Sequence, residues 1–158
     1  MRLETELKLK QPLASLNHEA LLSLVRTSTL IQKLSNRFFS KFELTDVQFN
    51  ILMILKDHGD EGLSQQELSE HLVVGKSNVV GLVDRLERAG YVRRTSHPSD
   101  RRFNQIVLAP KGAKLEQRVE QSYFEEVDKM MNVLTEAEKK ALIRAMGKIR
   151  QYILTSEL

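Results

Sequence analysis

The segment over residues 63–90 constrains the fold more than any other part of this chain. Ser64 is a helix N-cap, and Glu67 stands at the third helical position, so the pair forms a capping box at the start of a short helix. After a turn, a second amphipathic segment runs over 76–89 and ends at Gly90, a residue favoured just beyond helix C-termini. A short helix, a tight turn and a second amphipathic helix predict a helix-turn-helix.

The residues after Gly90 change from helical to strand periodicity. Residues 91–95 and 103–108 favour two strands, and the intervening 96–100 contains Ser, Pro and Asp, which favour a turn. Four arginines stand in pairs on the two sides of this turn: Arg93, Arg94, Arg101 and Arg102. A β-hairpin that follows the second helix predicts a winged helix-turn-helix.

The charge of the chain is concentrated in the same region. Residues 62–111 carry eight Lys or Arg and five Asp or Glu. Residues 1–61 carry eight basic and eight acidic residues, and so do residues 112–158. The whole formal charge of +3 therefore lies on the predicted winged helix. Local basicity of this kind suits a nucleic-acid partner, although a solvated surface hairpin is the alternative.

Further helices flank the winged helix. We expect one over about Pro12 to Ser40, one from a capping box at Thr45 to His58, one over 110–131 and one from Thr135 past Ile153. The predicted fold is mainly α with a small β-hairpin wing and has six helices.

Composition excludes several classes of protein. The chain has no cysteine, which rules out disulfides and thiolate metal sites and fits a cytoplasmic location. No apolar run is long enough to span a membrane. The four histidines are scattered without the spacing of a zinc site, and no motif of an enzyme is present, so we expect no metal, no cofactor and no catalysis.

Three segments resemble the MarR family of transcription regulators. They are LTDVQFNIL, then SQQELSEHLVVGKSNVVGLVDRLERAGYVRR, and then the wing sequence Asp100-Arg101-Arg102 followed by Leu108. Their order matches the family over nearly the whole chain. The resemblance implies a winged-helix homodimer on double-stranded DNA, built as one continuous domain. Residues 1–43 and 110–158 would form the dimerisation helices, and residues 44–109 would form the DNA-binding lobe.

The resemblance also assigns residues to DNA. The recognition helix would be Lys76–Ala89, and its outward residues would meet base edges or phosphates: Lys76, Ser77, Asn78, Val80 and Gly81. Asn can pair with adenine, and Val with a thymine methyl, although Asn78 could instead bond the backbone near the helix start. Arg85 would contact the DNA backbone, brace the wing, or pair with Asp84 or Asp100.

Within the wing, Arg102 matches the family's arginine that enters the minor groove, where negative potential attracts it. Asp100 matches the acid that braces the wing. The other three arginines, Arg93, Arg94 and Arg101, would serve phosphates, which set affinity without reading sequence.

The resulting hypothesis is a ligand-responsive repressor that binds an inverted-repeat operator. The family often binds anionic aromatic molecules, and Arg26 and Arg37 could meet such a carboxylate. The alternative is a protein-interaction module with only weak, non-specific DNA binding. Gly81 favours this alternative, because the family often has a larger polar side chain at that position.

Overall fold

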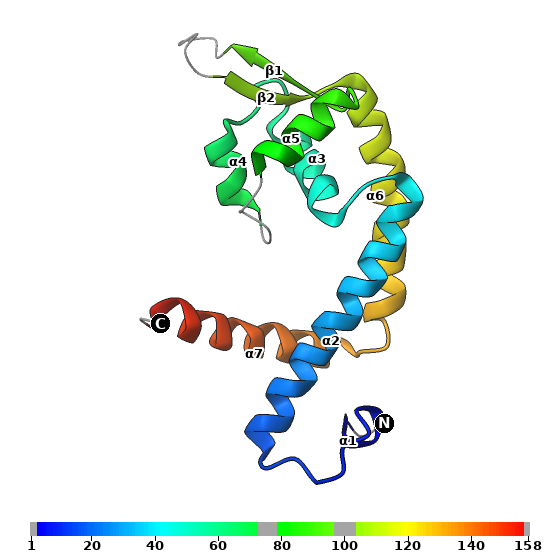
Figure 1. Ribbon diagram of the computed structural model, residues 1–158, viewed down its shortest axis with the longest axis vertical. Helices are drawn as coiled ribbons and strands as arrows, with labels where there is room; N and C mark the ends of the chain where they lie inside the picture. The colour runs from blue at the N-terminus through cyan, green and yellow to red at the C-terminus, as the bar shows by residue number, and fades with distance from the viewer. Residues whose placement is uncertain (1–2, 73–78, 97–103, 157–158) are drawn as a thin grey trace. The chain divides into compact units, whose positions relative to one another are not determined.

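The computed structural model describes residues 3–72, 79–96 and 104–156, which form seven α-helices, a short 3-10 helix and one two-stranded sheet (Figure 1). The elements are α1 (Leu3–Glu6), α2 (Leu16–Phe39), η1 (Ser40–Phe42), α3 (Asp46–His58), α4 (Gln65–His71), α5 (Val79–Arg88), β1 (Val92–Ser96), β2 (Asn104–Leu108), α6 (Pro110–Met131) and α7 (Glu136–Thr155). The predicted fold class is confirmed. The four-residue α1 was not predicted, because a segment so short has no helical period. The chain divides into two compact units, Met1–Ala113 and Lys114–Leu158.

Reciprocal caps start α3 and α4 where the sequence predicts them. Thr45 Oγ1 accepts a hydrogen bond from Gln48 N at 3.1 Å, and Gln48 Oε1 accepts one from Thr45 N at 2.9 Å. The same exchange joins Ser64 and Glu67, at 3.2 and 2.9 Å. Each box satisfies two backbone donors that a helix start leaves unpaired.

Buried side chains of α3 and α5 form the core of the first unit. On α5, which the sequence predicts to be amphipathic, they are Val79, Leu82, Val83 and Leu86. On α3 they are Phe49, Ile51, Leu52 and Leu55. The two helices are in contact. Full burial of such a side chain stabilises the fold by about 1.5–3 kcal/mol, so the paired stripes fix the face that α5 turns toward solvent.

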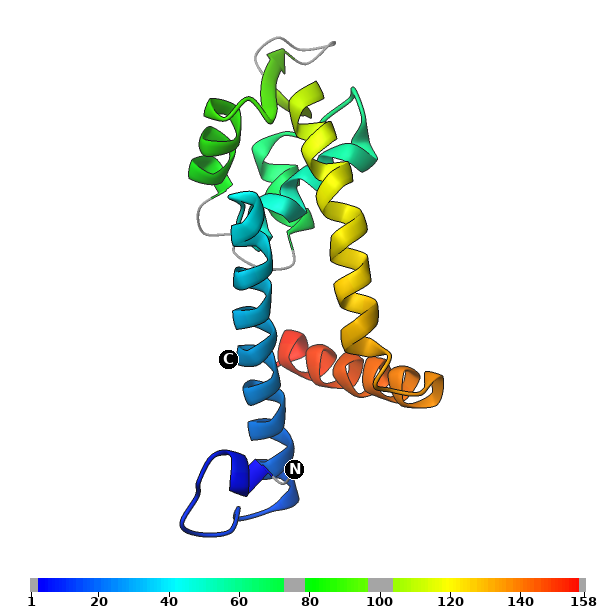
Figure 2. The same cartoon turned by 90° about the vertical axis from the view of Figure 1, so that its right-hand side faces the viewer.

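The hairpin pairs β1 with β2 antiparallel, with Val92 opposite Leu108 and Arg94 opposite Ile106. β1 lies next to α5 (Figures 1 and 2). On its other edge, β2 is held by the loop before α4, since Leu63 and Ile106 exchange backbone hydrogen bonds of 3.0 and 2.8 Å. The wing is therefore fixed to the helix-turn-helix from two sides.

The long helix α2 begins later than predicted. Its N-cap is Ser15, whose side chain accepts a hydrogen bond from His18 N at 3.2 Å, so the helix starts at Leu16 and not near Pro12. Figure 2 shows α2 as one unbroken helix. At its far end the Phe39 ring meets Phe49, with ring centroids 5.1 Å apart. Much of its apolar stripe is exposed: Leu16, Leu21, Val25, Leu30, Ile31 and Leu34.

The second unit contains most of α6 and all of α7. The start of α6 at Pro110 and the capping box of Thr135 and Glu138 are as predicted. On α7, an apolar set is exposed: Leu142, Ile143, Ile149, Tyr152, Ile153 and Leu154. Within the described residues, no helix is both long enough and apolar enough to cross a membrane.

Candidate nucleic-acid interface

The outward face of α5 is the first part of the candidate interface. With Val79, Leu82, Val83 and Leu86 buried, the helical period turns Val80 and Arg85 toward solvent. The Val80 side chain is 56% exposed. Gly81, which follows Val80 in the sequence, is half-buried.

Several predicted contact residues lie outside the described part of the chain. They are Lys76, Ser77 and Asn78 before α5, and Asp100, Arg101 and Arg102 between the two strands. Val80, Gly81, Arg85, Arg93 and Arg94 are described.

Arg94 joins the wing to α5 through two carboxylates. Its Nη2 donates a hydrogen bond to Asp84 Oδ1 at 2.6 Å, and its Nη1 donates to Glu87 Oε2. The backbone N–H of Arg94 also donates to Glu87 Oε1, at 3.1 Å. The hydrogen bond to Asp84 is the main reason why the pKa of Arg94 is raised, although burial opposes it. The Arg94 guanidinium thus links β1 to α5 through Asp84 and Glu87. The sequence predicted a phosphate contact for Arg94, and a wing-bracing role for Asp100 or Arg85.

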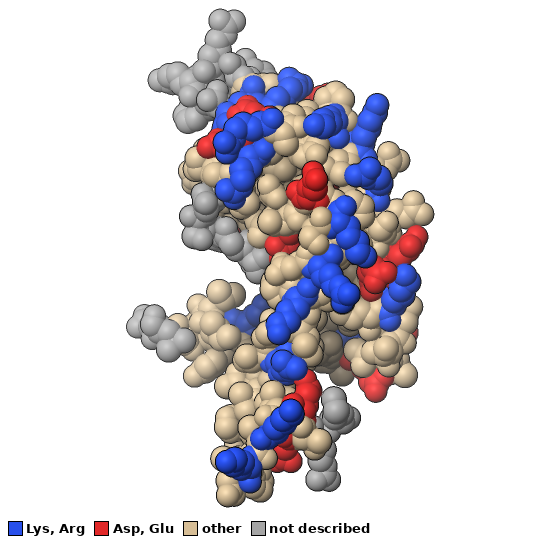
Figure 3. All heavy atoms as spheres, turned by 45° about the vertical axis from the view of Figure 1, so that its right-hand side comes forward, with Lys and Arg blue, Asp and Glu red and all other residues tan. Residues whose placement is uncertain are grey.

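Three neighbouring arginines are exposed: Arg85, Arg88 and Arg93. Successive strand residues point to opposite faces, so Arg93 points away from the face on which Arg94 meets α5. Arg88 Nε donates a hydrogen bond to the Asp84 carbonyl at 3.3 Å. Figure 3 shows Lys and Arg side chains grouped around this end of the first unit, with a few acidic side chains among them.

The junction between α5 and β1 is closed by a Schellman motif and a lysine. Gly90 has φ of 74°. Gly90 N donates to Glu87 O at 2.8 Å and Tyr91 N to Leu86 O at 2.9 Å, which is the hydrogen-bond pair of that motif. Lys111 Nζ donates to the Ala89 carbonyl at 2.7 Å and lies 4.8 Å from the centre of the Tyr91 ring. Lys111 and Ala89 are 22 residues apart, so no local sequence pattern indicates this contact.

The two arginines considered for an anionic ligand differ in their surroundings. Arg26 Nε donates a hydrogen bond to Glu6 Oε1 at 2.7 Å, so α1 provides a carboxylate for this arginine. Arg37 is exposed in the last turn of α2.

Comparison with known proteins identifies the family. A profile of the MarR family matches residues 42–102. The HTH-type transcriptional repressor YetL of Bacillus subtilis is 33% identical over 130 residues, which is 82% of this chain and 77% of YetL. The chain belongs to the MarR family. It is therefore a helix-turn-helix transcriptional regulator, and its relatives are regulators rather than enzymes, as the sequence predicts.

Solved MarR-type structures share the fold. Sco3205 from Streptomyces coelicolor, determined in complex with DNA, is 24% identical, covers 94% of each chain and gives a TM-score of 0.78. CouR from Rhodococcus jostii RHA1, determined bound to p-coumaroyl-CoA, is 23% identical, covers 92% of this chain and 99% of its own, and gives a TM-score of 0.71. The predicted MarR resemblance is confirmed in sequence and in fold.

Proposed function

We propose that this MarR protein is a homodimeric repressor that binds an inverted-repeat operator in double-stranded DNA. The observation that carries the proposal is the fixed geometry of α5 and the hairpin. Arg94 and the Schellman turn hold the wing at a set position beside α5, whose outward face carries Val80 and Arg85. A helix presented to the major groove and a wing held beside it form the two-part footprint that a winged helix needs.

Within this proposal, the contacts divide by chemistry. Lys76, Ser77, Asn78, Val80 and Gly81 read base edges or nearby phosphates in the major groove. Arg85, Arg93 and Arg101 contact phosphates, and Arg102 enters the minor groove while Asp100 braces the wing. Arg94 acts by positioning the hairpin and by neutralising two carboxylates that would otherwise face DNA.

Exposed apolar faces support the dimer. In the first unit, Leu21, Val25 and Ile31 of α2 are exposed, and in the second, Ile143 and Leu154 of α7 are 67% and 84% exposed. Large apolar stripes on soluble helices favour burial against a partner. A two-fold homodimer presents two recognition helices, so its half-sites lie about 10–10.5 base pairs apart, or at a multiple of that spacing.

An anionic aromatic ligand is proposed as the effector, with Arg26 and Arg37 as its candidate partners. The p-coumaroyl-CoA bound to CouR supports this class of ligand. Arg26 is already paired with Glu6, so a ligand carboxylate at Arg26 would have to compete with Glu6, whereas Arg37 is exposed. A ligand that binds one arrangement of the dimer better than another shifts the population and hence the DNA affinity.

Fluorescence anisotropy tests the proposal. The duplex upstream of the protein's own gene is titrated beside a scrambled duplex at several salt concentrations. We expect the native duplex to bind at least about 10³-fold more tightly, with affinity falling steeply as salt rises. Equal, weak binding of both duplexes, repeated with duplexes selected from a random pool, would instead favour the protein-interaction module.

Arg102→Ala tests the wing within the same assay. Loss of an arginine from the minor groove should weaken specific binding by more than tenfold, on the order of the 1–3 kcal/mol expected for a base contact. Lys140→Ala is the matched control, because Lys140 is an exposed cation on α7. Full operator affinity in Arg102→Ala would refute the minor-groove assignment.

A further inference from the structure

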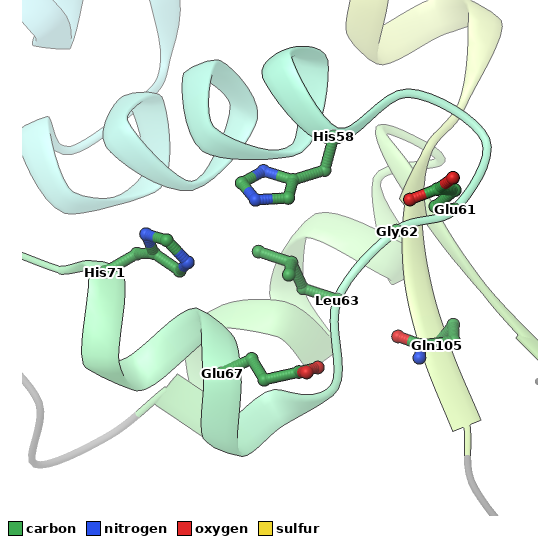
Figure 4. Close-up of a pocket in the computed structure, with 7 residues that line it drawn as sticks. All are labelled: His58, Glu61, Gly62, Leu63, Glu67, His71 and Gln105. Carbon is green, nitrogen blue, oxygen red and sulfur yellow. The ribbon is translucent and has the colours of Figure 1, made fainter.

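Two histidines meet in the helix-turn-helix although they are far apart in sequence. His58 ends α3 and His71 ends α4. Their ring centroids are 5.1 Å apart, with an angle of 65° between the ring planes. Figure 4 shows both rings turned toward a pocket of about 590 Å³, which Glu61, Glu67 and Gln105 also line. The crossing of two helices, and not a sequence motif, brings these side chains together.

A hydrogen bond fixes the protonation pattern of His58. Its Nδ1 lies 2.8 Å from the carbonyl oxygen of Ile54. A carbonyl oxygen only accepts, so Nδ1 carries the proton and, in the neutral ring, Nε2 carries a lone pair. Metal-binding histidines have this same arrangement, with one ring N–H donated to a carbonyl and the other nitrogen directed at the ion.

The spacing of the rings fits a shared ion. With metal–nitrogen distances of about 2.0–2.1 Å and a tetrahedral angle, two imidazole centroids lie about 5 Å apart. The observed separation between His58 and His71 is 5.1 Å. Two rings that only pack edge to face also have centroids about 4.5–7 Å apart. The separation therefore does not distinguish simple ring packing from a shared ion. The feature that favours an ion is the proton fixed on His58 Nδ1.

We propose that His58 and His71 bind one divalent transition-metal ion of the Zn²⁺ class. Among the residues that the structure describes, no three His, Cys, Asp or Glu side chains are placed so that they could hold a metal ion together. The two histidines would therefore be its protein ligands, and water would complete the coordination. The buried Oε1 of Gln105 has no hydrogen-bond partner among these residues and lines the same pocket, where it can accept from such a water. Glu61 and Glu67 add negative charge on the rim.

The ion would link the ends of α3 and α4. The two helices are in contact, and each has a fully buried leucine, Leu55 on α3 and Leu68 on α4. Because the ion binds the folded arrangement of the two rings, it should raise the midpoint of thermal unfolding by mass action. This inference departs from the sequence-based expectation of no metal site.

Metal binding is tested on the full chain without DNA. Zn²⁺ is titrated against a chromophoric chelator, and Co²⁺ absorption reports the ligand field of the bound ion. We expect one ion per chain. His58→Gln and His71→Gln should each weaken binding by more than about tenfold, since even loss of an outer hydrogen-bond partner costs about 10–100-fold. His18→Gln is the matched control, because His18 is an exposed histidine on α2.

Three results would overturn the site: no ion bound at chain stoichiometry, binding in His58→Gln and His71→Gln as tight as in the wild type, or loss of binding in His18→Gln. Should a variant fail to fold, the wild-type titration still decides, because absence of a stoichiometric ion there refutes the proposal. The assay contains no DNA, so its failure leaves the proposed operator binding intact, and failure of operator binding leaves the metal site intact.

Discussion

Replacing Arg94 with Ala tests the brace between the wing and α5. The substitution removes the hydrogen bonds to Asp84 Oδ1 and Glu87 Oε2, while the backbone N–H of residue 94 still donates to Glu87. Two carboxylates are left without their cation on the helix that we propose faces DNA. Stability and DNA affinity should therefore both fall, for related but separable reasons.

The expected loss of stability follows from exposure. The side chains of Arg94, Asp84 and Glu87 are 26%, 46% and 36% exposed. Solvent screens such pairs, and exposed ion pairs contribute about 0.2–1 kcal/mol each. Two pairs then correspond to about 0.4–2 kcal/mol in the free energy of unfolding. For a chain of this size the melting temperature should fall by about 1–8 °C.

Measurements of DNA binding distinguish a bracing role of Arg94 from a direct contact between Arg94 and a DNA phosphate. Should Arg94 brace the wing, a triple variant in which Asp84→Asn and Glu87→Gln accompany Arg94→Ala should recover part of the lost affinity, because the unpaired negative charges are gone. The salt dependence of binding should change little in the single variant. Anisotropy titrations of both variants at several salt concentrations measure both quantities.

A direct phosphate contact gives the opposite pattern. Loss of one such contact lowers the slope of log affinity against log salt by about 0.9, and removing the carboxylates does not restore it. Arg93→Ala is the matched comparison, since Arg93 is exposed on the same strand. It should lower the slope by about 0.9 and change stability by less than about 0.5 kcal/mol. Identical slopes and stabilities in the two single variants would refute the division of roles.

Further variants test the frame around the interface. Gly62→Ala should lower the free energy of unfolding by more than Gly59→Ala in chemical denaturation: both glycines have positive φ, costing about 1–2 kcal/mol, but only at Gly62 would a Cβ clash with the Ile106 carbonyl. Equal losses would contradict this packing. Thr135→Ala should lower the free energy of unfolding by about 1 kcal/mol and leave DNA affinity unchanged. Loss of DNA binding in a folded Thr135→Ala variant would contradict the expectation that this cap affects stability alone. Hydrogen bonds from Thr135 lower the pKa of Glu138, so their stabilisation is present at neutral pH and is lost as pH falls through that lowered pKa. Glu138→Gln should remove this acid dependence, and an unchanged pH profile would contradict it.

Local signals predicted most of the fold. Capping boxes at Thr45, Ser64 and Thr135 involve residues three apart, so they can be read without knowing the fold, and all three are present. The buried stripe of α5 follows from its helical period. The start of α2 was misplaced because Pro12 suits a first helical turn, whereas the hydrogen bond to the Ser15 side chain decides where the helix begins.

Contacts between elements were not predictable from local patterns. The pairing of Arg94 with Asp84 and Glu87 spans ten and seven residues and depends on how β1 passes α5. From the sequence, the ion-pair partner suggested for Asp84 was its neighbour Arg85. His58 and His71 likewise meet only because α3 and α4 end side by side.

The contacts at the end of α5 limit how a ligand can regulate DNA binding. Gly90 fixes the turn after the helix, Lys111 donates a hydrogen bond to the Ala89 carbonyl, and Arg94 pairs the following strand with Asp84 on α5. Leu63 fixes the second strand from the opposite edge. Because β1 and β2 are held at these points, we expect the described part of the hairpin and α5 to move as one body. A ligand that weakens DNA binding must then act on the separation or orientation of whole lobes in the proposed dimer, through rigid-body motion, rather than by bending the wing away from its helix.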